Sequence, residues 1–209
     1  MSVQKAYDNW SQQYDTNENK TRDLEAVALR ETLAGIAFES CLEIGCGTGK
    51  NTAWLITKAK SITAVDLSTE MLARAKQKIN IENVHFIQAD ILQDWDFTDK
   101  KYDLVSFSLM LEHIEKLEPI FNKVSKIIEP GGYVYIGELH PFKQYSGSKA
   151  RFCTDEGEQV VSCFNHNISD FIKAAKLFGF SIVNMDEYFD ENDRVAMPRI
   201  LTMLLRSGD

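Results

Sequence analysis

Residues 42–49 read Leu-Glu-Ile-Gly-Cys-Gly-Thr-Gly, an apolar run followed by glycines at every second position. The run Cys41–Ile44 is typical of a buried strand, and the glycines after it indicate a tight turn. Because glycine lacks a Cβ atom, the backbone at Gly45, Gly47 and Gly49 can approach a ligand closely. Amides that open the next helix can bind an anion. This turn is the first candidate ligand site.

The spacing of these glycines departs from two common phosphate-binding motifs. The dinucleotide fingerprint G-x-G-x-x-G needs a glycine where this chain has Lys50. A P-loop needs Gly-Lys followed by Ser or Thr after a longer loop, and that arrangement is missing. Taken alone, the turn is also compatible with a tight connection that binds nothing.

Strand-like and helix-like stretches alternate along most of the chain. Strands are expected at 41–44, 61–65, 83–88, 102–108 and 133–139, and helices at 22–36, 51–60, 68–79, 117–128 and 169–178. Such alternation predicts right-handed crossovers and a parallel sheet with helices on both faces. Two final β-rich runs, 180–188 and 198–205, have no helix between them and predict an antiparallel hairpin. The expected fold is α/β, a Rossmann-like sheet of seven strands.

The chain has 209 residues, which favours a single domain over 1–209. Residues 140–165 interrupt the alternation and are expected to be an insertion on the substrate side. Acidic residues number 31 against 23 Lys and Arg, a net charge of −8 that disfavours nucleic-acid partners. The sequence has no apolar run of membrane-spanning length, no apolar N-terminal leader and no paired-cysteine metal motif. We therefore expect a cytoplasmic protein that has no membrane partner.

Acidic residues follow the next two expected strands. In an open α/β sheet, ligands bind beyond the carboxyl ends of the strands, where the strand order reverses. Asp66, Asp90 and 106–108 should therefore meet the glycine turn at one crevice. A carboxylate at Asp66 can accept both hydroxyls of a ribose, and one at Asp90 can accept an adenine amine. The alternatives are a helix-capping acid for Asp66 and a turn residue for Asp90.

Together these features resemble the class I S-adenosylmethionine-dependent methyltransferases. The resemblance rests on residues 42–49, Asp66, Asp90 and the run Tyr-Asp-Leu-Val at 102–105, and covers residues 38–139. It implies S-adenosyl-L-methionine as methyl donor and S-adenosyl-L-homocysteine as product. The segment with Tyr7, Trp10 and Tyr14 looks like the N-terminal lid of the branch that acts in ubiquinone and menaquinone biosynthesis.

The resemblance also implies roles for individual residues. The residues expected around the methionine part are Glu43, Gly45, Cys46, Gly47 and Gly49. Asp66 would hold the ribose, with Leu67 or Met71 against the adenine. Asp90 and Ile91 would lie at the adenine edge, and Phe107 or Ser108 beside the transferable methyl. Residues 1–36 resemble a helical lid in which Tyr14 meets the cofactor carboxylate; a helix packed on the sheet is the alternative.

Two histidines are candidates for a general base, which matters only when the acceptor starts protonated. His140 ends an expected strand and shares its face with Glu138, and His166 precedes a helix. Some relatives bind a metal through E-x-x-E-H. This chain has Leu109 at the first position of that pattern, before His113, so no metal is expected.

The insertion combines cations with aromatic side chains. Lys149 and Arg151 occur there among Phe142, Tyr145, Phe152 and Phe164, which suits a flat or partly anionic acceptor. A surface excursion with its own small core is the alternative.

The expected function is methyl transfer by in-line displacement to an O, N or S atom of a small molecule. The alternatives are a non-catalytic partner that binds S-adenosylmethionine, or an oxidoreductase that uses a nicotinamide dinucleotide. Residues 106–109 read Ser-Phe-Ser-Leu rather than the [DN]-P-P-[YF] of base-amino methylases, which disfavours nucleic acid as acceptor. A homodimer is left open.

Overall fold

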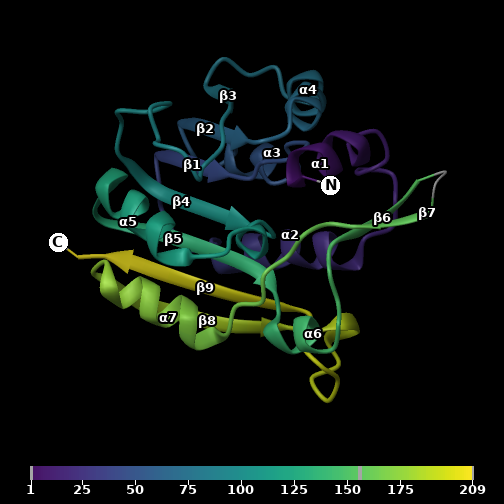
Figure 1. The fold of residues 1–209 in the computed structure, drawn as a ribbon. Coiled ribbons are helices and arrows are strands. Elements are labelled where there is room, and N and C mark those ends of the chain that lie inside the picture. The colour runs from purple at the N-terminus through teal and green to yellow at the C-terminus, as the bar shows by residue number, and fades with distance from the viewer. Residues whose placement is uncertain (1, 155–156, 209) are drawn as a thin grey trace.

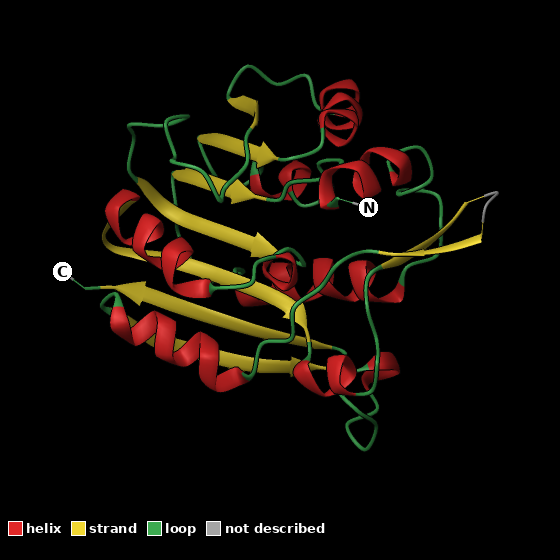
Figure 2. Ribbon diagram, in the orientation of Figure 1, coloured by secondary structure: helices red, strands yellow, loops and turns green. Residues whose placement is uncertain are grey.

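The computed structural model describes residues 2–154 and 157–208, without the side chains of 152–154 and 158. Its helices are α1 (Val3–Trp10), α2 (Lys20–Thr32), α3 (Thr52–Leu55), α4 (Thr69–Lys78), α5 (Leu117–Ile127), α6 (Pro141–Tyr145) and α7 (Ile168–Leu177). Its strands are β1 (Ser40–Ile44), β2 (Ser61–Asp66), β3 (Val84–Gln88), β4 (Tyr102–Ser108), β5 (Ile128–Leu139), β6 (Arg151–Thr154), β7 (Gly157–Val160), β8 (Phe180–Tyr188) and β9 (Ile200–Ser207). Figures 1 and 2 show their arrangement.

The main sheet has seven strands in the order β3-β2-β1-β4-β5-β9-β8. Strands β1 to β5 are parallel, and β9 pairs antiparallel with both β5 and β8. The expected fold class is therefore confirmed, including the C-terminal hairpin. The strand order reverses at β1, which lies between β2 and β4, so the predicted switch point follows the glycine turn.

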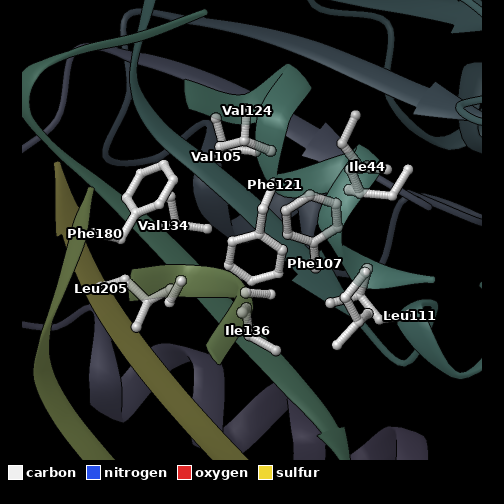
Figure 3. Close-up of a cluster of buried hydrophobic side chains, with 14 of the residues drawn as sticks. Ile44, Val105, Phe107, Leu111, Phe121, Val124, Val134, Ile136, Phe180 and Leu205 are labelled. Carbon is white, nitrogen blue, oxygen red and sulfur yellow. The ribbon is translucent and has the colours of Figure 1, made fainter. Parts of the chain in front are cut away.

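Two hydrophobic cores fill the space between the sheet and its helices. On one face, α5 and α7 cover a core that includes Phe107, Phe121 and Phe180; the rings of Phe121 and Phe180 meet edge to face at 6.1 Å (Figure 3). On the other face, α2, α3 and α4 contribute Leu29, Leu55 and Leu72. Burial on both faces explains why the central strands are apolar along their length.

Several expected elements have different bounds in the structure; α2, for example, ends at Thr32 rather than at residue 36. Helix α3 covers only Thr52–Leu55, and turns follow it. Strand β5 begins at Ile128, directly after α5, rather than at Tyr133. Tyr102 pairs with Ile128, and the register then shifts so that Leu104 pairs with Tyr133. The expected turn at 129–132 is thus an irregularity inside the strand.

The segment expected as an insertion has structure of its own. It contains α6 and a separate two-stranded sheet of β6 and β7, which projects from the main body (Figure 1). The side chains of Phe152 and Cys153 lie outside the described part. Helix α1 lies on the same side of the molecule and packs Ala6 and Trp10 with Met71 and Val161. None of the helices in the described ranges combines the length and hydropathy that a membrane span requires.

Candidate functional site

The glycine turn leaves the backbone of Gly47 open. Gly45 and Gly47 have φ of +77° and +53°, in the left-handed region that favours glycine. A Cβ at Gly45 would lie 2.9 Å from Cβ of Met110, whereas a Cβ at Gly47 would meet nothing within 4 Å. Gly45 thus allows β1 to pack against the segment after β4, and Gly47 leaves open space above the strand end.

Asp66 lies directly beside this turn. Its Oδ2 accepts a hydrogen bond from the amide of Gly47 and its Oδ1 from that of Ser68, both at 2.8 Å. Burial raises the pKa of Asp66, while these amide bonds oppose the shift. Each bond occupies one acceptor position, so both oxygens can still accept from a ligand hydroxyl.

A cavity of about 170 Å³, here called the aspartate cavity, opens at the ends of β1 to β4. Nine predicted site residues line it: Tyr14, Gly45, Gly47, Asp66, Leu67, Met71, Asp90, Ile91 and Ser108. The expected gathering of the strand ends is therefore present. Phe107 lies instead in the core under α5, 1% exposed, and Gly49 faces Ile79.

A smaller cavity of about 40 Å³, the polar cavity, adjoins the aspartate cavity and shares Gly45, Gly47 and Ser108 with it. The predicted residues Glu43 and Cys46 line it. Burial raises the pKa of Glu43 to about 8, although the Thr52 hydroxyl donates to its carboxylate at 2.5 Å. Glu43 is therefore largely protonated at neutral pH.

The polar cavity also has polar lining residues that were not predicted from the sequence, among them Arg22, Glu25 and Asn51. The Asn51 amide donates to Glu25 at 2.9 Å and to Ser108 at 3.2 Å. Its Oδ1 is buried and has no hydrogen-bond partner in the described part of the chain. Arg22 donates to the carbonyls of Tyr14 and Asn17 and to the Asp23 carboxylate.

The first helix covers the site through an aromatic group. The rings of Tyr7 and Trp10 stack at 5.7 Å, and Tyr14 meets Trp10 edge to face at 4.9 Å. The Tyr7 hydroxyl lies 2.8 Å from Nε2 of His113, a residue just after β4. Tyr7 of α1 and Tyr14 of the turn after it both line the aspartate cavity, so this segment lies over the crevice; its role as a lid stays a prediction.

A third cavity of about 610 Å³, the outer cavity, lies on the other side of these aromatics. Tyr14 and Leu109 line all three cavities, and Tyr7 lines the aspartate and outer cavities. Leu109 has φ of +53°, a conformation that non-glycine residues rarely adopt. Such strained residues concentrate at functional sites.

The two histidines expected to be catalytic have other partners. His140 is fully buried; its Nδ1 accepts from the amide of Phe142 and its Nε2 lies 2.9 Å from Glu187. His166 Nε2 lies 2.7 Å from the carbonyl of Ile114. Neither residue lines any of the three cavities. These contacts favour structural roles, against our expectation of a general base.

Glu138 and His140 do not form the expected pair. Strand β5 ends at Leu139, and His140 is the N-cap of α6, so the alternation of the strand does not extend to it. Glu138 instead accepts hydrogen bonds from the amides of Met110 and Leu111, at 3.0 and 2.8 Å. It thereby fixes the segment that follows β4.

Glu112, His113 and Cys163 place one potential metal-ligand atom each within 4.8 Å of one another. Both nitrogens of the His113 ring already have partners, since Nδ1 lies 2.9 Å from the carbonyl of Ser162 and Nε2 from Tyr7. A metal would have to replace one of these bonds. That no metal is needed stays a prediction.

Comparison with known proteins agrees with this geometry. Residues 42–136 match a family described as a methyltransferase domain. The chain is 30% identical over 195 residues to a malonyl-[acyl-carrier protein] O-methyltransferase of Marinomonas sp., which covers 89% of this chain and 70% of that protein. A ubiquinone biosynthesis O-methyltransferase of Hydrogenovibrio crunogenus is 27% identical over 147 residues, 68% of this chain and 59% of its own.

One solved structure matches over nearly the whole fold. The protein DhpI, determined as a complex with SAH, superposes with a TM-score of 0.77 at 26% identity, covering 98% of this chain and 94% of DhpI. It has also been solved as a SAM-HEP complex. The fold is therefore shared with a protein that has been solved with SAH and with SAM.

Proposed function

This chain belongs to the class I S-adenosylmethionine-dependent methyltransferases, and from that premise we propose that it moves a methyl group to a small-molecule acceptor by in-line displacement. The observation that carries the proposal is the junction of cavities at Tyr14 and Leu109. An in-line displacement needs donor and acceptor to meet from opposite sides. The aspartate and polar cavities form one side of the junction and the outer cavity forms the other.

The residues around the two inner cavities fit S-adenosylmethionine. Asp66 retains acceptor capacity for ribose hydroxyls, and Gly47 leaves room beside it. Asn51 Oδ1, buried without a partner in the described part of the chain, suits an ammonium donor. Arg22 supplies a cation at the same end for a carboxylate. We assign the nucleoside to the aspartate cavity and the amino-acid end to the polar cavity.

When bound, S-adenosylmethionine supplies an electrophilic methyl group on a sulfonium, a good leaving group. The protein's part is to orient the acceptor and exclude water, and such positioning is worth about 7–11 kcal/mol in well-oriented reactions. Tyr7, Trp10 and Tyr14 cover the junction from above, and Leu109 borders it from the sheet. This arrangement supports catalysis by positioning without a histidine base.

The cofactor assignment is tested with Asp66→Ala. Loss of the carboxylate should weaken the binding of S-adenosylhomocysteine by about 1.5–3 kcal/mol, the scale of hydrogen bonds to a charged group. Isothermal titration calorimetry measures this, with the exposed residue variant Asp99→Asn as a matched control. Unchanged affinity in Asp66→Ala would contradict the ribose assignment.

Methyl transfer itself is tested by an acceptor screen with S-adenosylmethionine, read by mass spectrometry of the products. The screen should include phenols, amines, thiols and carboxylic acids, because the type of nucleophile is open. We expect a product heavier by one methylene unit together with S-adenosylhomocysteine. A protein that binds S-adenosylhomocysteine but methylates no small molecule would be a non-catalytic binding partner instead.

A further inference from the structure

The outer cavity is rich in cationic side chains, although the chain as a whole carries a net charge of −8. Lys20, Lys149, Arg151 and Arg199 line it, against the carboxylates Glu18 and Glu112. These cations come from three separate places: the start of α2, the segment 149–151 that leads into β6, and the residue before β9. The fold therefore collects positive charge here from distant parts of an acidic chain.

The four cations differ in how far their charge is neutralised. Arg199 is paired with Asp190 through two hydrogen bonds of 2.5 Å. Lys20 and Lys149 form no ion pair with any carboxylate in the described ranges. Lys149 is exposed, so its ammonium is hydrated and can exchange water for a ligand oxygen.

The two carboxylates of the cavity do not cancel this charge. Glu112 is 5% exposed, and one of its oxygens is buried without a partner in the described part of the chain. Burial raises its pKa, which favours the neutral acid. Glu18 is exposed, so its charge is screened by water. The remaining field near Lys149 is positive.

Another part of the cavity lining is aromatic and reaches the cavity junction. It consists of Tyr7, Trp10 and Tyr14, and Tyr14 also lines both inner cavities. A ligand held by the cations at one end can therefore extend along the aromatic wall toward Leu109. A volume of about 610 Å³ is in the range of small-molecule sites.

We propose that the outer cavity is the acceptor site and that it selects acceptors carrying an oxyanion group, with Lys149 as the main anchor of that group. The inference rests on the proposed function and names its substrate class. A carboxylate and a phosphate-type group share the required chemistry, because both present anionic oxygens to ammonium and guanidinium donors. Phe142 and Tyr145, the aromatics of α6, do not line this cavity and take no part.

The test uses protein saturated with S-adenosylhomocysteine and two matched pairs of probes, with affinity measured by ligand-observed NMR titration. Malonate is compared with malonamide, and phenylphosphonate with its neutral dimethyl ester. We expect each anion to bind at least about tenfold more tightly than its neutral partner, and added salt to weaken only the anions. The stronger of the two anions identifies whether the site prefers a carboxylate or a phosphate-type group.

Variants then locate the anion. Lys149→Gln should weaken anion binding about tenfold, Lys149→Arg should retain it, and Lys176→Gln, an exposed change on α7, should leave it unchanged. Because Lys149 is exposed, its replacement should not unfold the chain. Lys20→Gln provides a second variant, with a smaller loss expected.

The outcomes separate the two proposals. Equal binding of neutral and anionic probes, absence of anion binding, or full anion affinity in Lys149→Gln overturns the oxyanion assignment while the proposed function stands. Failure of the wild-type protein to bind S-adenosylhomocysteine overturns the proposed function and this inference together.

Discussion

The Tyr7 hydroxyl and Nε2 of His113 lie 2.8 Å apart, 106 positions apart in the sequence. On the other side of the ring, Nδ1 lies 2.9 Å from the carbonyl of Ser162. A carbonyl only accepts, so Nδ1 carries the proton and Nε2 accepts from Tyr7. One imidazole thus joins α1, the segment after β4 and the segment after β7 above the cavities.

Tyr7→Phe should loosen this lid. The change removes the hydroxyl donor and leaves Nε2 of His113 without its partner, while the aromatic ring keeps its packing. A net hydrogen bond is worth about 0.5–1.5 kcal/mol, so affinity for S-adenosylhomocysteine should fall about two- to tenfold. Calorimetric titration measures the change, with Tyr145→Phe, an exposed tyrosine, as control. Full affinity in Tyr7→Phe would mean that the lid does not depend on this contact.

The sequence predicted the strand ends of the site better than its lining. Asp66 and Asp90 each follow an apolar run, and parallel strands bring such residues to one edge by geometry alone. Arg22, Glu25 and Asn51 have no such signal, because the burial of a charged or amide side chain depends on elements far away in the chain. Glu25, for example, is buried against Tyr135, 110 positions later.

The bounds of the helices and strands were likewise predicted well only where neighbouring residues in the sequence decide them. Strands β4 and β8 have the predicted bounds, because turn residues flank their apolar runs. Strand β5 ends at Leu139 as predicted, but the short helix that Pro141 opens, with His140 as its cap, was not predicted. That local event turned the expected Glu138–His140 pair into two unrelated contacts.

Leu109→Gly distinguishes the backbone strain at position 109 from the contribution of the leucine side chain to turnover. Leu109 has φ of +53°, which costs a leucine on the order of 1 kcal/mol and a glycine nothing. Glycine loses a similar amount through chain entropy, so the free energy of unfolding should change by less than about 1 kcal/mol. Turnover should nevertheless fall about tenfold or more, because the side chain borders all three cavities. Urea unfolding and steady-state kinetics check the two effects; normal turnover would remove Leu109 from the junction.

Glu138→Gln should change how stability depends on pH. Burial raises the pKa of Glu138 to about 8, against 4.5 for an exposed glutamate. The folded state therefore holds this proton while the unfolded state releases it, and stability is lost as pH rises from 4.5 to 8. Glutamine can still accept from Met110 and Leu111 but does not titrate.

The measurement for Glu138 is the melting temperature of wild type and variant from pH 4.5 to 8.5. Relative to wild type, Glu138→Gln should gain several degrees on going from pH 5 to pH 8, at roughly 2–4 °C for each kcal/mol. Glu118→Gln, on the exposed side of α5, should show no such trend. Parallel curves for wild type and Glu138→Gln would contradict the raised pKa.

His140→Ala decides between a catalytic and a structural histidine. The contacts of His140 with Glu187 and the amide of Phe142 predict a loss of about 1–3 kcal/mol in stability when they are removed. Burial lowers the pKa of His140 below 6.5, and Glu187 opposes that shift. The unfolded chain therefore binds the proton more tightly, so the stability that the lowered pKa contributes is complete above pH 6.5 and is lost as pH falls below that value.

A general base would instead contribute about 10²–10⁴-fold to turnover. We expect a lower melting temperature at pH 8 with turnover of the folded enzyme within twofold of wild type. A hundredfold loss of turnover at unchanged stability would restore the catalytic role. His166→Ala should behave in the same way, because the Ile114 carbonyl already occupies its Nε2.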